Sequence, residues 1–208
     1  VLLSDGVVYA GVGESLNFGW TRKEIVTYLE GIYAKSISSK SLSTLLLERA
    51  NTLYNHRPGD DATVLTLRRR SRANVNFLNG PATRKEDDPK VMSLFFSKAG
   101  KHLVSGGTSA HVVSNFLHQK IETSLDYEDP EIPPISTIKG VDLVTEGVIT
   151  LNKVVKLAED YLDGNQAYFD WSYKQDGASL LAQELFEEAT DISFYVGCAV
   201  NPAHQDPR

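Results

Sequence analysis

The chain opens with Val1-Leu2-Leu3-Ser4-Asp5-Gly6-Val7-Val8, an apolar run that ends in a single carboxylate and a glycine. The apolar run predicts a buried strand, and the glycine allows the backbone to turn away from it. A strand of this kind presents Asp5 at the edge of a sheet, where a metal ion or a phosphate can reach it. This stretch therefore sets the expected architecture of the first part of the chain.

A second acidic stretch follows further along the chain, in Gly59-Asp60-Asp61-Ala62-Thr63-Val64-Leu65. A turn glycine and two acids lead directly into another β-branched, apolar strand. Sheet pairing of the two strands would bring carboxylates together, and paired carboxylates suit a hard cation such as Mg²⁺ or Mn²⁺. The alternative for Asp5 is an ordinary turn aspartate, because Asp-Gly is a common turn dipeptide.

These two motifs, in this order and separated by two predicted helices, carry a resemblance to a known family. Residues 1 to about 70 resemble the C-terminal third of bacterial metal-dependent protein serine/threonine phosphatases of the stage II sporulation protein E family, which are protein phosphatase 2C-like. The resemblance implies that Asp5 and Asp60 are metal ligands, with Asp61 beside the second one. It also implies Mg or Mn as cofactor and a phosphoprotein as substrate.

The same resemblance implies a further Asp-Gly strand upstream, and no residue precedes Val1 in this sequence. We therefore expect a fragment of a phosphatase that is inactive alone, because two carboxylates fall short of the roughly six oxygen ligands that each Mg²⁺ takes. Unpaired strand edges and an uncovered helix face also lead us to expect a homodimer.

Charge divides the chain near a run of arginines at Arg68–Arg72. Residues 1–72 carry ten Lys/Arg and seven Asp/Glu, a balance of +3, and the remainder carries eleven and twenty, a balance of −9. We predict two domains, 1–72 and 73–208. Since the chain as a whole is acidic, the arginine run is interpreted as a solvated linker, and no nucleic-acid partner is expected.

The first domain is predicted to be a partial phosphatase-like unit of strand, helix, helix and strand. Thr21-Arg22-Lys23-Glu24 is a capping-box sequence that begins the first helix. Ser39 or Ser41 begins the second helix, Pro58-Gly59 follows it, and Ala62–Leu67 forms the last strand.

The second domain shows a regular alternation that predicts a Rossmann-like α/β fold with a mostly parallel sheet. Strands are expected at 75–78, 102–104, 141–144 and 192–200, each before or after an amphipathic helix. Asp88-Pro89 predicts a helix start, with an acid at the cap and proline at the first position. Residues 122–140 are predicted to be a proline-rich loop, and 168–173 an aromatic loop.

Ligands of an open parallel sheet bind beyond the carboxyl ends of its strands. There the sequence offers Gly106, Gly107, Thr108 and Ser109 at a predicted strand-to-helix junction, with Glu146 after the next strand. Free amides at a helix start form an anion site, so these residues are candidates for phosphate or nucleotide binding. The alternative is a tight turn that Thr108 caps. A regulatory phosphate- or nucleotide-binding domain is thus the second functional hypothesis.

Other features narrow the class of protein. The single Cys198 excludes an internal disulfide, which fits a cytoplasmic protein, and its apolar surroundings predict a core position. The histidines show no zinc-site spacing with Cys198. No apolar run approaches the roughly twenty residues of a membrane span, so no membrane partner is expected.

Overall fold

The computed structural model describes residues 1–33, 37–124, 129–163 and 174–199. The chain divides into two compact units, Val1–Arg70 and Ser71–Arg208. The seam between them lies inside the arginine run, just before the boundary that the charge pattern predicted. Each unit is described by itself below. The predicted aromatic loop at 168–173 and the end of the predicted last strand at residue 200 lie outside the described residues.

In the first unit, strand β1 pairs antiparallel with strand β2, so that Leu2 faces Leu65 and Leu3 faces Val64. The prediction of a buried first strand is wrong, because Leu2 is 63% exposed, and only Leu3 and Val64 face the core. The elements in chain order are β1 (Leu2–Leu3), α1 (Asp5–Val8), α2 (Arg22–Ile32), α3 (Ser39–Leu53) and β2 (Val64–Leu65).

The predicted capping box is present at the start of α2. The Thr21 hydroxyl accepts the N–H of Glu24, and the Glu24 carboxylate accepts the N–H of Thr21 at 2.9 Å. Helices α2 and α3 then bury one apolar stripe each against α1 and the inner face of the two strands. The buried side chains of this core are Val7, Ala10, Trp20, Ile25, Leu46, Ala50, Leu53 and Tyr54.

In the second unit, six strands of the described residues form one sheet, in the order β5-β6-β7-β4-β3-β8. The four strands β7, β4, β3 and β8 are parallel to one another, and β8 forms one edge of the sheet. At the other edge β6 pairs antiparallel with β7, and β5 pairs antiparallel with β6. The expected mixed α/β class with a mostly parallel sheet is confirmed. The strands are β3 (Asn74–Asn79), β4 (Lys101–Ser105), β5 (Glu122–Thr123), β6 (Ser136–Thr137), β7 (Leu143–Thr145) and β8 (Asp191–Val196).

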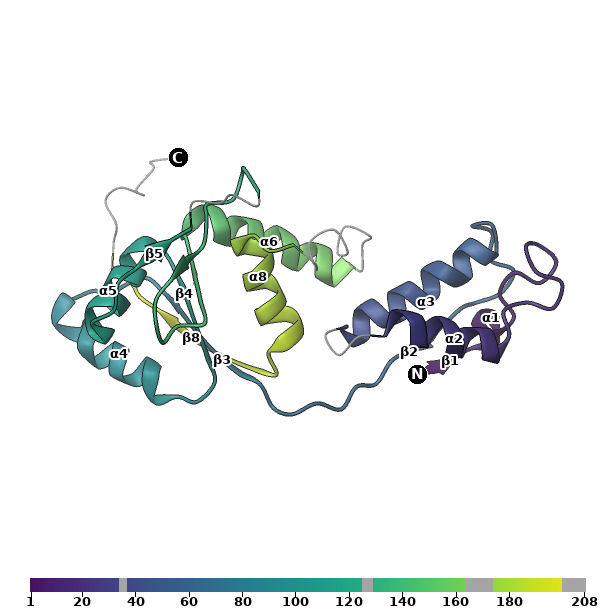
Figure 1. Ribbon diagram of the computed structural model, residues 1–208, viewed down its shortest axis with the longest axis horizontal. Coiled ribbons are helices and arrows are strands. Elements are labelled where there is room, and N and C mark those ends of the chain that lie inside the picture. The colour runs from purple at the N-terminus through teal and green to yellow at the C-terminus, as the bar shows by residue number, and fades with distance from the viewer. Residues whose placement is uncertain (34–36, 125–128, 164–173, 200–208) are drawn as a thin grey trace. The chain divides into compact units, whose positions relative to one another are not determined.

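Alternation along these strands produces two separate cores. Phe77 and Leu103 face one side of the sheet with α6 and α8, and Leu78 and Val104 face the other side with α4 and α5. Figure 1 shows these two helix pairs on either side of the strands. The helices are η1 (Lys85–Asp87), α4 (Asp88–Ser97), α5 (Gly107–Leu117), α6 (Val148–Asp163), α8 (Gly177–Ala182) and the π-helix η2 (Gln183–Glu188).

Two predictions about local structure need correction. The segment 122–140 contains the short strands β5 and β6, which pair with each other through Glu122 and Thr137, so it is not a loop throughout. Its polar, proline-rich composition gives no alternating pattern, and the pairing comes from the neighbouring strand β7. Cys198 follows β8 and is exposed, because this strand lies at the open edge of the sheet.

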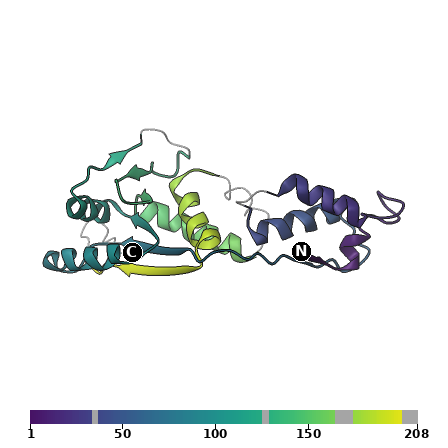
Figure 2. The ribbon, with the colours of Figure 1, turned by 60° about the horizontal axis from the view of Figure 1, so that its bottom comes forward.

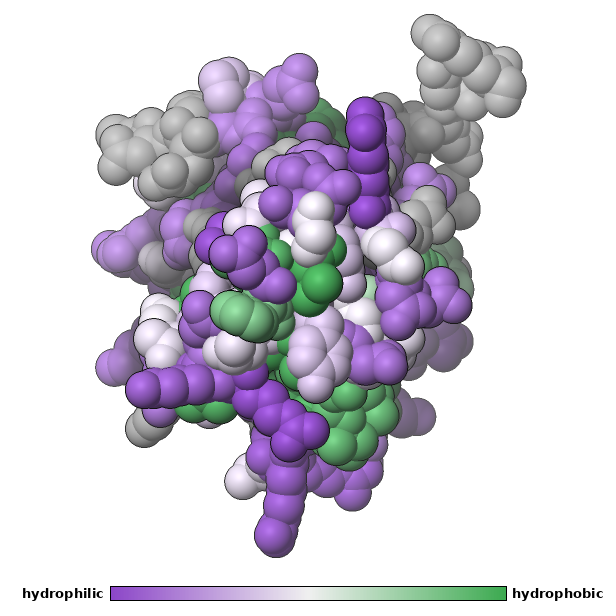
Figure 3. Space-filling model, turned by 90° about the vertical axis from the view of Figure 1, so that its right-hand side faces the viewer, coloured by the Kyte–Doolittle hydropathy of each residue, from purple (hydrophilic) through white to green (hydrophobic). Residues whose placement is uncertain are grey.

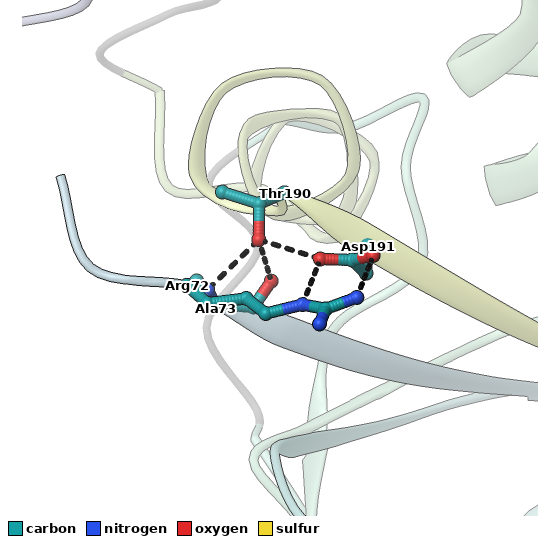
Figure 4. Close-up of polar contacts among 4 residues, drawn as sticks. All are labelled: Arg72, Ala73, Thr190 and Asp191. Atoms are coloured by element: carbon teal, nitrogen blue, oxygen red, sulfur yellow. Dashed lines mark hydrogen bonds and ion pairs between the residues drawn. The ribbon is translucent and has the colours of Figure 1, made fainter. Parts of the chain in front are cut away.

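Hydrogen bonds and an ion pair connect the first residues of the second unit to its last strand, β8. Arg72 donates from Nε to Asp191 Oδ2 at 2.7 Å and from Nη2 to Oδ1 at 2.5 Å (Figure 4). The Thr190 hydroxyl accepts the N–H of Ala73 at 2.9 Å. Together these bonds set the register in which β3 and β8 begin. The hydrogen bond from Arg72, and next the one from the Thr190 hydroxyl, lower the pKa of the Asp191 carboxyl to about 2.

The surface of the first unit in Figure 3 is mainly hydrophilic, with separate hydrophobic areas between the charged side chains. Large exposed apolar side chains of this unit include Phe18, Leu67, Leu2, Tyr33 and Tyr9. Within the described residues, the helices are all too short or too polar to cross a membrane.

Candidate functional site

Ser4 joins the two acidic stretches of the first unit. Its N–H donates to the Thr63 carbonyl at 3.0 Å, its Oγ accepts the Thr63 N–H at 2.9 Å, and the same Oγ donates to the Asp61 carbonyl at 3.1 Å. These bonds extend the β1–β2 pairing past the end of both strands. The residues after β1 therefore lie directly beside the residues before β2.

Gly6 is required at this place by close packing. A Cβ atom on Gly6 would lie 2.4 Å from the carbonyl oxygen of Asp61 and 2.9 Å from its carbonyl carbon. The sequence had attributed this glycine to a backbone turn, yet Gly6 lies in the short helix α1 and has no positive φ. The glycine instead allows the backbones of Asp5-Gly6 and Asp60-Asp61 to touch.

Tyr54 is a buried residue beside the first acidic stretch. Its hydroxyl donates to the Gly6 carbonyl at 3.0 Å, and the residue is only 6% exposed. Burial raises the pKa of this phenol, and the negative charges of Asp60 and Asp5 raise it further. Both carboxylates therefore lie within electrostatic reach of the Tyr54 hydroxyl.

The carboxylates themselves are open to a ligand. Asp5, Asp60 and Asp61 are all exposed. Oδ1 of Asp5 accepts the Gly6 N–H at 3.1 Å, and Oδ1 of Asp60 accepts the Asp61 N–H at 2.8 Å. Each of these two side chains is thus oriented by the backbone next to it, and its second oxygen makes no hydrogen bond within the described residues.

The donor set fits a hard divalent ion in part. Carboxylate oxygens are the ligands that Mg²⁺ and Mn²⁺ prefer, and Mg²⁺ usually keeps several waters beside one or two carboxylates. Among the residues that the structure describes, no three His, Cys, Asp or Glu side chains gather closely enough to hold a metal. The predicted ligands Asp5, Asp60 and Asp61 therefore do not form such a group, and Asp5 and Asp60 would supply only part of the shell of an ion bound there.

A separate cavity of the first unit, about 590 Å³ in volume, does not include these acids. Its lining is mostly apolar and comes from α2, α3 and the residues after β2, among them Leu29, Tyr33, Ile37, Leu42 and Leu67. The cavity offers none of the predicted ligand groups, so it does not enlarge the candidate metal site.

In the second unit the carboxyl ends of three parallel strands meet. The Gly106 N–H donates to the Thr145 carbonyl at 3.0 Å, and the Ser105 hydroxyl donates to the Glu146 carbonyl at 2.8 Å. A Cβ atom on Gly147 would lie 3.3 Å from the Cα of Gly106. The end of β4 and the end of β7 are thus held in direct backbone contact.

The predicted phosphate loop adopts a different turn from the one expected. Gly106, with φ of 101°, is the residue before α5, and no side chain caps that helix, so the prediction that Thr108 caps it is wrong. Thr108 is exposed, whereas Ser109 is buried and its hydroxyl accepts the Gly80 N–H at 2.8 Å. Ser109 therefore connects α5 to the end of β3, and its hydroxyl is used in this internal bond.

A cavity of about 460 Å³ lies at this edge, within the usual size of small-molecule sites, about 300–1,000 Å³. Gly107 and His111 of α5 line it on one side, and Thr145 and Glu146 line it at the end of β7. Among the described residues, Oε2 of Glu146 is buried and has no hydrogen-bond partner. Glu146 thus lines the cavity, while this oxygen of its carboxylate is closed off from solvent.

The sequence missed the residues that close this cavity. Pro133 and Pro134 separate it from a smaller one of about 210 Å³, which Asp176 and Gly177 line. Asp176 is buried and accepts the N–H groups of Ala178 and Ser179, both at 3.0 Å, so it caps α8. Asp-Gly directly before the last apolar helix was the signal in the sequence for this cap.

The space between the carboxyl ends of β3 and β8 is filled by backbone. Gly197 donates to the Asn79 carbonyl at 2.8 Å, and a Cβ atom on Gly197 would lie 2.1 Å from the Pro81 carbonyl oxygen. The usual binding point of such sheets is thus closed here. The open space lies one strand further, at the ends of β4 and β7.

A search of protein families, of curated proteins and of solved structures finds no match to this chain.

Proposed function

We propose that the first unit carries part of the metal site of a metal-dependent protein serine/threonine phosphatase. The proposal combines the resemblance of the two acidic motifs to that family with one observation. The observation is the backbone contact of Gly6 with Asp61, beside a Tyr54 hydroxyl on which both Asp5 and Asp60 act. The reaction class is hydrolysis of phosphoserine or phosphothreonine in a phosphoprotein substrate.

The residues of this chain have distinct parts in that function. Asp5 and Asp60 bind the metal through their outward oxygens, and Asp61 binds it directly or accepts a hydrogen bond from a ligand water. Ser4 holds the two stretches together through the Asp61 carbonyl, and Tyr54 fixes the first stretch to the end of α3 through the Gly6 carbonyl. When bound, Mg or Mn ions lower the pKa of an attacking water and offset charge on the phosphoryl oxygens. With this partial shell, we expect weak metal binding and no turnover from this chain alone.

Isothermal titration with Mn²⁺ tests the metal site. The Asp5→Asn and Asp60→Asn variants should each lose most of the binding heat, because each removes a charged ligand. Glu30→Gln is the matched control, since Glu30 is an exposed acid on α2 of the same unit. Equal Mn²⁺ affinity in the wild-type chain and in both aspartate variants would remove the support for this function.

Turnover is tested in a longer protein that adds an upstream Asp-Gly strand. It should hydrolyse a generic aryl phosphate in the presence of Mn²⁺, and Asp60→Asn should reduce the rate by at least about a hundredfold, the effect of losing a principal stabilising group. A folded longer protein without turnover would count against the phosphatase.

A second candidate function belongs to the second unit, as a regulatory phosphate- or nucleotide-binding domain. It is favoured by the cavity beside Gly107, which Glu146 lines with a carboxylate that has one unpartnered oxygen among the described residues. There the free amides at the start of α5 would bind a phosphate, and Glu146 would accept a hydroxyl of a ribose. Gly106, Thr108 and Ser109 shape the turn that positions those amides.

Titration with a panel of nucleoside phosphates and with inorganic phosphate tests this second candidate. Gly107→Val should weaken the binding of all these ligands, because its side chain blocks the amides at the start of α5. Glu146→Gln should weaken the binding of nucleoside phosphates more than that of inorganic phosphate. Glu122→Gln, at an exposed position on β5, is the matched control. Affinities that do not differ among these variants would contradict the assignment.

A further inference from the structure

Strand β8 forms an open edge of the sheet of the second unit. It pairs with β3 on one side, and it is the last strand in the sheet order among the described residues. The N–H groups of Asp191 and Gly197 donate to Ala73 and Asn79, so odd-numbered residues of this strand face β3. Because a strand alternates, the backbone groups of Ile192, Phe194 and Val196 are directed to the open edge.

The same three residues carry the apolar side chains of one face. Ile192 packs against the core beside α6 and α8, while Phe194 is 60% exposed and Val196 is 64% exposed. Phe194 contacts Phe77 edge-to-face, with ring centroids 5.9 Å apart. The apolar surface of this face thus continues from the core to the edge of the sheet, where it is uncovered.

The edge lacks the usual features that prevent pairing. Natural edge strands commonly carry lysine, proline or a bulge. Between Asp191 and Gly197, β8 contains no charged residue and no proline. Its one charge, Asp191, is at the start of the strand and is paired with Arg72. Strand β8, seen at the edge of the sheet in Figure 2, thus has five uncharged residues after Asp191 and two exposed apolar side chains, which makes it a template for pairing with another strand.

We propose that β8 of a second copy of this chain is that partner, paired antiparallel about a two-fold axis at Phe194. In this register Phe194 faces its own symmetry mate, and Ile192 faces Val196 of the second copy. All three residues direct their N–H and C=O groups to the edge, so the pairing forms about six backbone hydrogen bonds. It joins two sheets into one continuous sheet.

The side chains and charges of the two copies fit this register. The two Phe194 rings form a cross-strand aromatic pair, which stabilises antiparallel strands, as do apolar pairs such as Ile192 with Val196. Asp191 of one copy falls opposite Gly197 of the other, so no like charges meet. A two-fold axis makes the surface complementary to itself, which favours a second copy over an unrelated strand.

The expected dimer is weak. A strand of six residues is about 20 Å long, and an interface of this length lies near the lower end of specific interfaces, about 1,000 Å². We therefore expect a dissociation constant on the order of 10 μM.

Sedimentation velocity over a micromolar concentration series measures the monomer–dimer equilibrium and so tests the β8 interface. Val196→Lys should weaken the dimer by about tenfold or more, because it places two lysines in the interface. Leu94→Lys is a matched control, since Leu94 is 54% exposed and belongs to helix α4, not to the strand edge. Leu65→Lys tests the open face of the first unit, where Leu65 is 48% exposed.

A dimer that Val196→Lys weakens and the two controls leave intact supports the proposal. Three outcomes would overturn it: a chain that stays monomeric at high concentration, a dimer that only Leu65→Lys disrupts, and a monomer in which β8 is taken up by another protein.

Disulfide crosslinking tests the register without relying on stability. In a Cys198→Ser background, Phe194→Cys should form a covalent dimer on oxidation, because opposite Cα atoms of a hydrogen-bonded pair lie about 5.5 Å apart, within disulfide range. Ile192→Cys alone should not crosslink to itself, whereas a mixture of Ile192→Cys and Val196→Cys chains should. Crosslinking of Ile192→Cys to itself in preference to Phe194→Cys would overturn this register.

Discussion

The two units differ in how many faces of their sheets are covered. In the first unit α2 and α3 cover one face of a two-stranded sheet, and Leu2 and Leu65 remain exposed on the other. In the second unit, helices cover both faces of a larger sheet, which gives two cores. Since stability grows with buried apolar area, the first unit has the smaller reserve against mutation.

Their strand-to-helix junctions differ in the same way. Gly6 is in contact with the Asp61 carbonyl, while a Cβ atom on Gly107 would meet nothing within 4 Å. The first glycine closes a contact between two backbones, and the second leaves space beside a cavity. Similar glycine-containing motifs therefore have different roles: Gly6 allows two backbones to pack closely, and Gly107 leaves a cavity open to a ligand. The difference follows from the burial of Gly6 and the exposure of Gly107.

The largest effect should come from truncating a fully buried leucine in each unit. Leu46→Ala and Leu103→Ala each remove a side chain with no exposed surface, at a cost of about 2–5 kcal/mol. This loss should unfold the first unit and leave the second folded, because natural stability is only roughly 0.05–0.15 kcal/mol per residue. Hydrogen exchange resolved by peptide would show it; equal protection of both units would contradict the comparison.

A smaller effect is expected from glycine substitution. Gly6→Ala should destabilise the first unit by about 1–3 kcal/mol, because the new methyl group meets the Asp61 carbonyl oxygen at 2.4 Å. Gly107→Ala should leave the stability of the second unit unchanged within about 0.5 kcal/mol, the usual range for sites without special features. Urea unfolding measures both, and similar costs for the two would show that the contact at Gly6 is relieved easily.

Acid should loosen the start of β3 and β8. The pKa of Asp191 is lowered to about 2 by Arg72, so the ion pair contributes stability above the ordinary pKa of 3.8 and loses it as the pH falls toward 2. Asp191→Asn should remove this dependence. Both side chains are largely exposed, so the effect should be small and should shrink in high salt. Amide exchange of β8 as a function of pH is the measurement.

The smallest effect concerns the phenol of Tyr54. Its pKa lies above the ordinary value of 10.0 because of burial, then Asp60, then Asp5. Asp60→Asn and Asp5→Asn should each lower that pKa, and the Asp60 variant should do so more. Because the folded pKa is the higher one, this group supports folding below pH 10 and loses that support as the pH rises further. Ultraviolet titration of the phenol would detect the shifts. An unchanged Tyr54 pKa in both variants would show that Asp5 and Asp60 do not act on this hydroxyl.

Local signals in the sequence predicted much of the secondary structure. Thr21 and Glu24 identified the start of α2, and Pro89 identified the first turn of α4, because caps and proline act within one turn. The strands β5 and β6 were missed, since two-residue strands carry no period and exist only through pairing with β7. Cys198 was misplaced for a similar reason, because composition does not reveal which strand lies at an edge.

The candidate sites divide in the same manner. Asp5, Asp60 and Glu146 were chosen from the sequence because acids at the ends of apolar strands lie at the edge of a sheet. The contact of Gly6 with Asp61, the hydrogen bond from Tyr54 to Gly6 and the buried, unpartnered oxygen of Glu146 needed the folded chain. These features join residues far apart in the sequence, and no local pattern encodes them.

The sequence alone determined the alternation of helices and strands, the helix caps and the division of charge between the two units, because each depends on neighbouring residues. Tertiary structure alone decided the order of the strands, the open edge at β8 and which side chains are buried without a partner. These depend on long-range pairing and on exclusion of water, which follow only when the elements pack together.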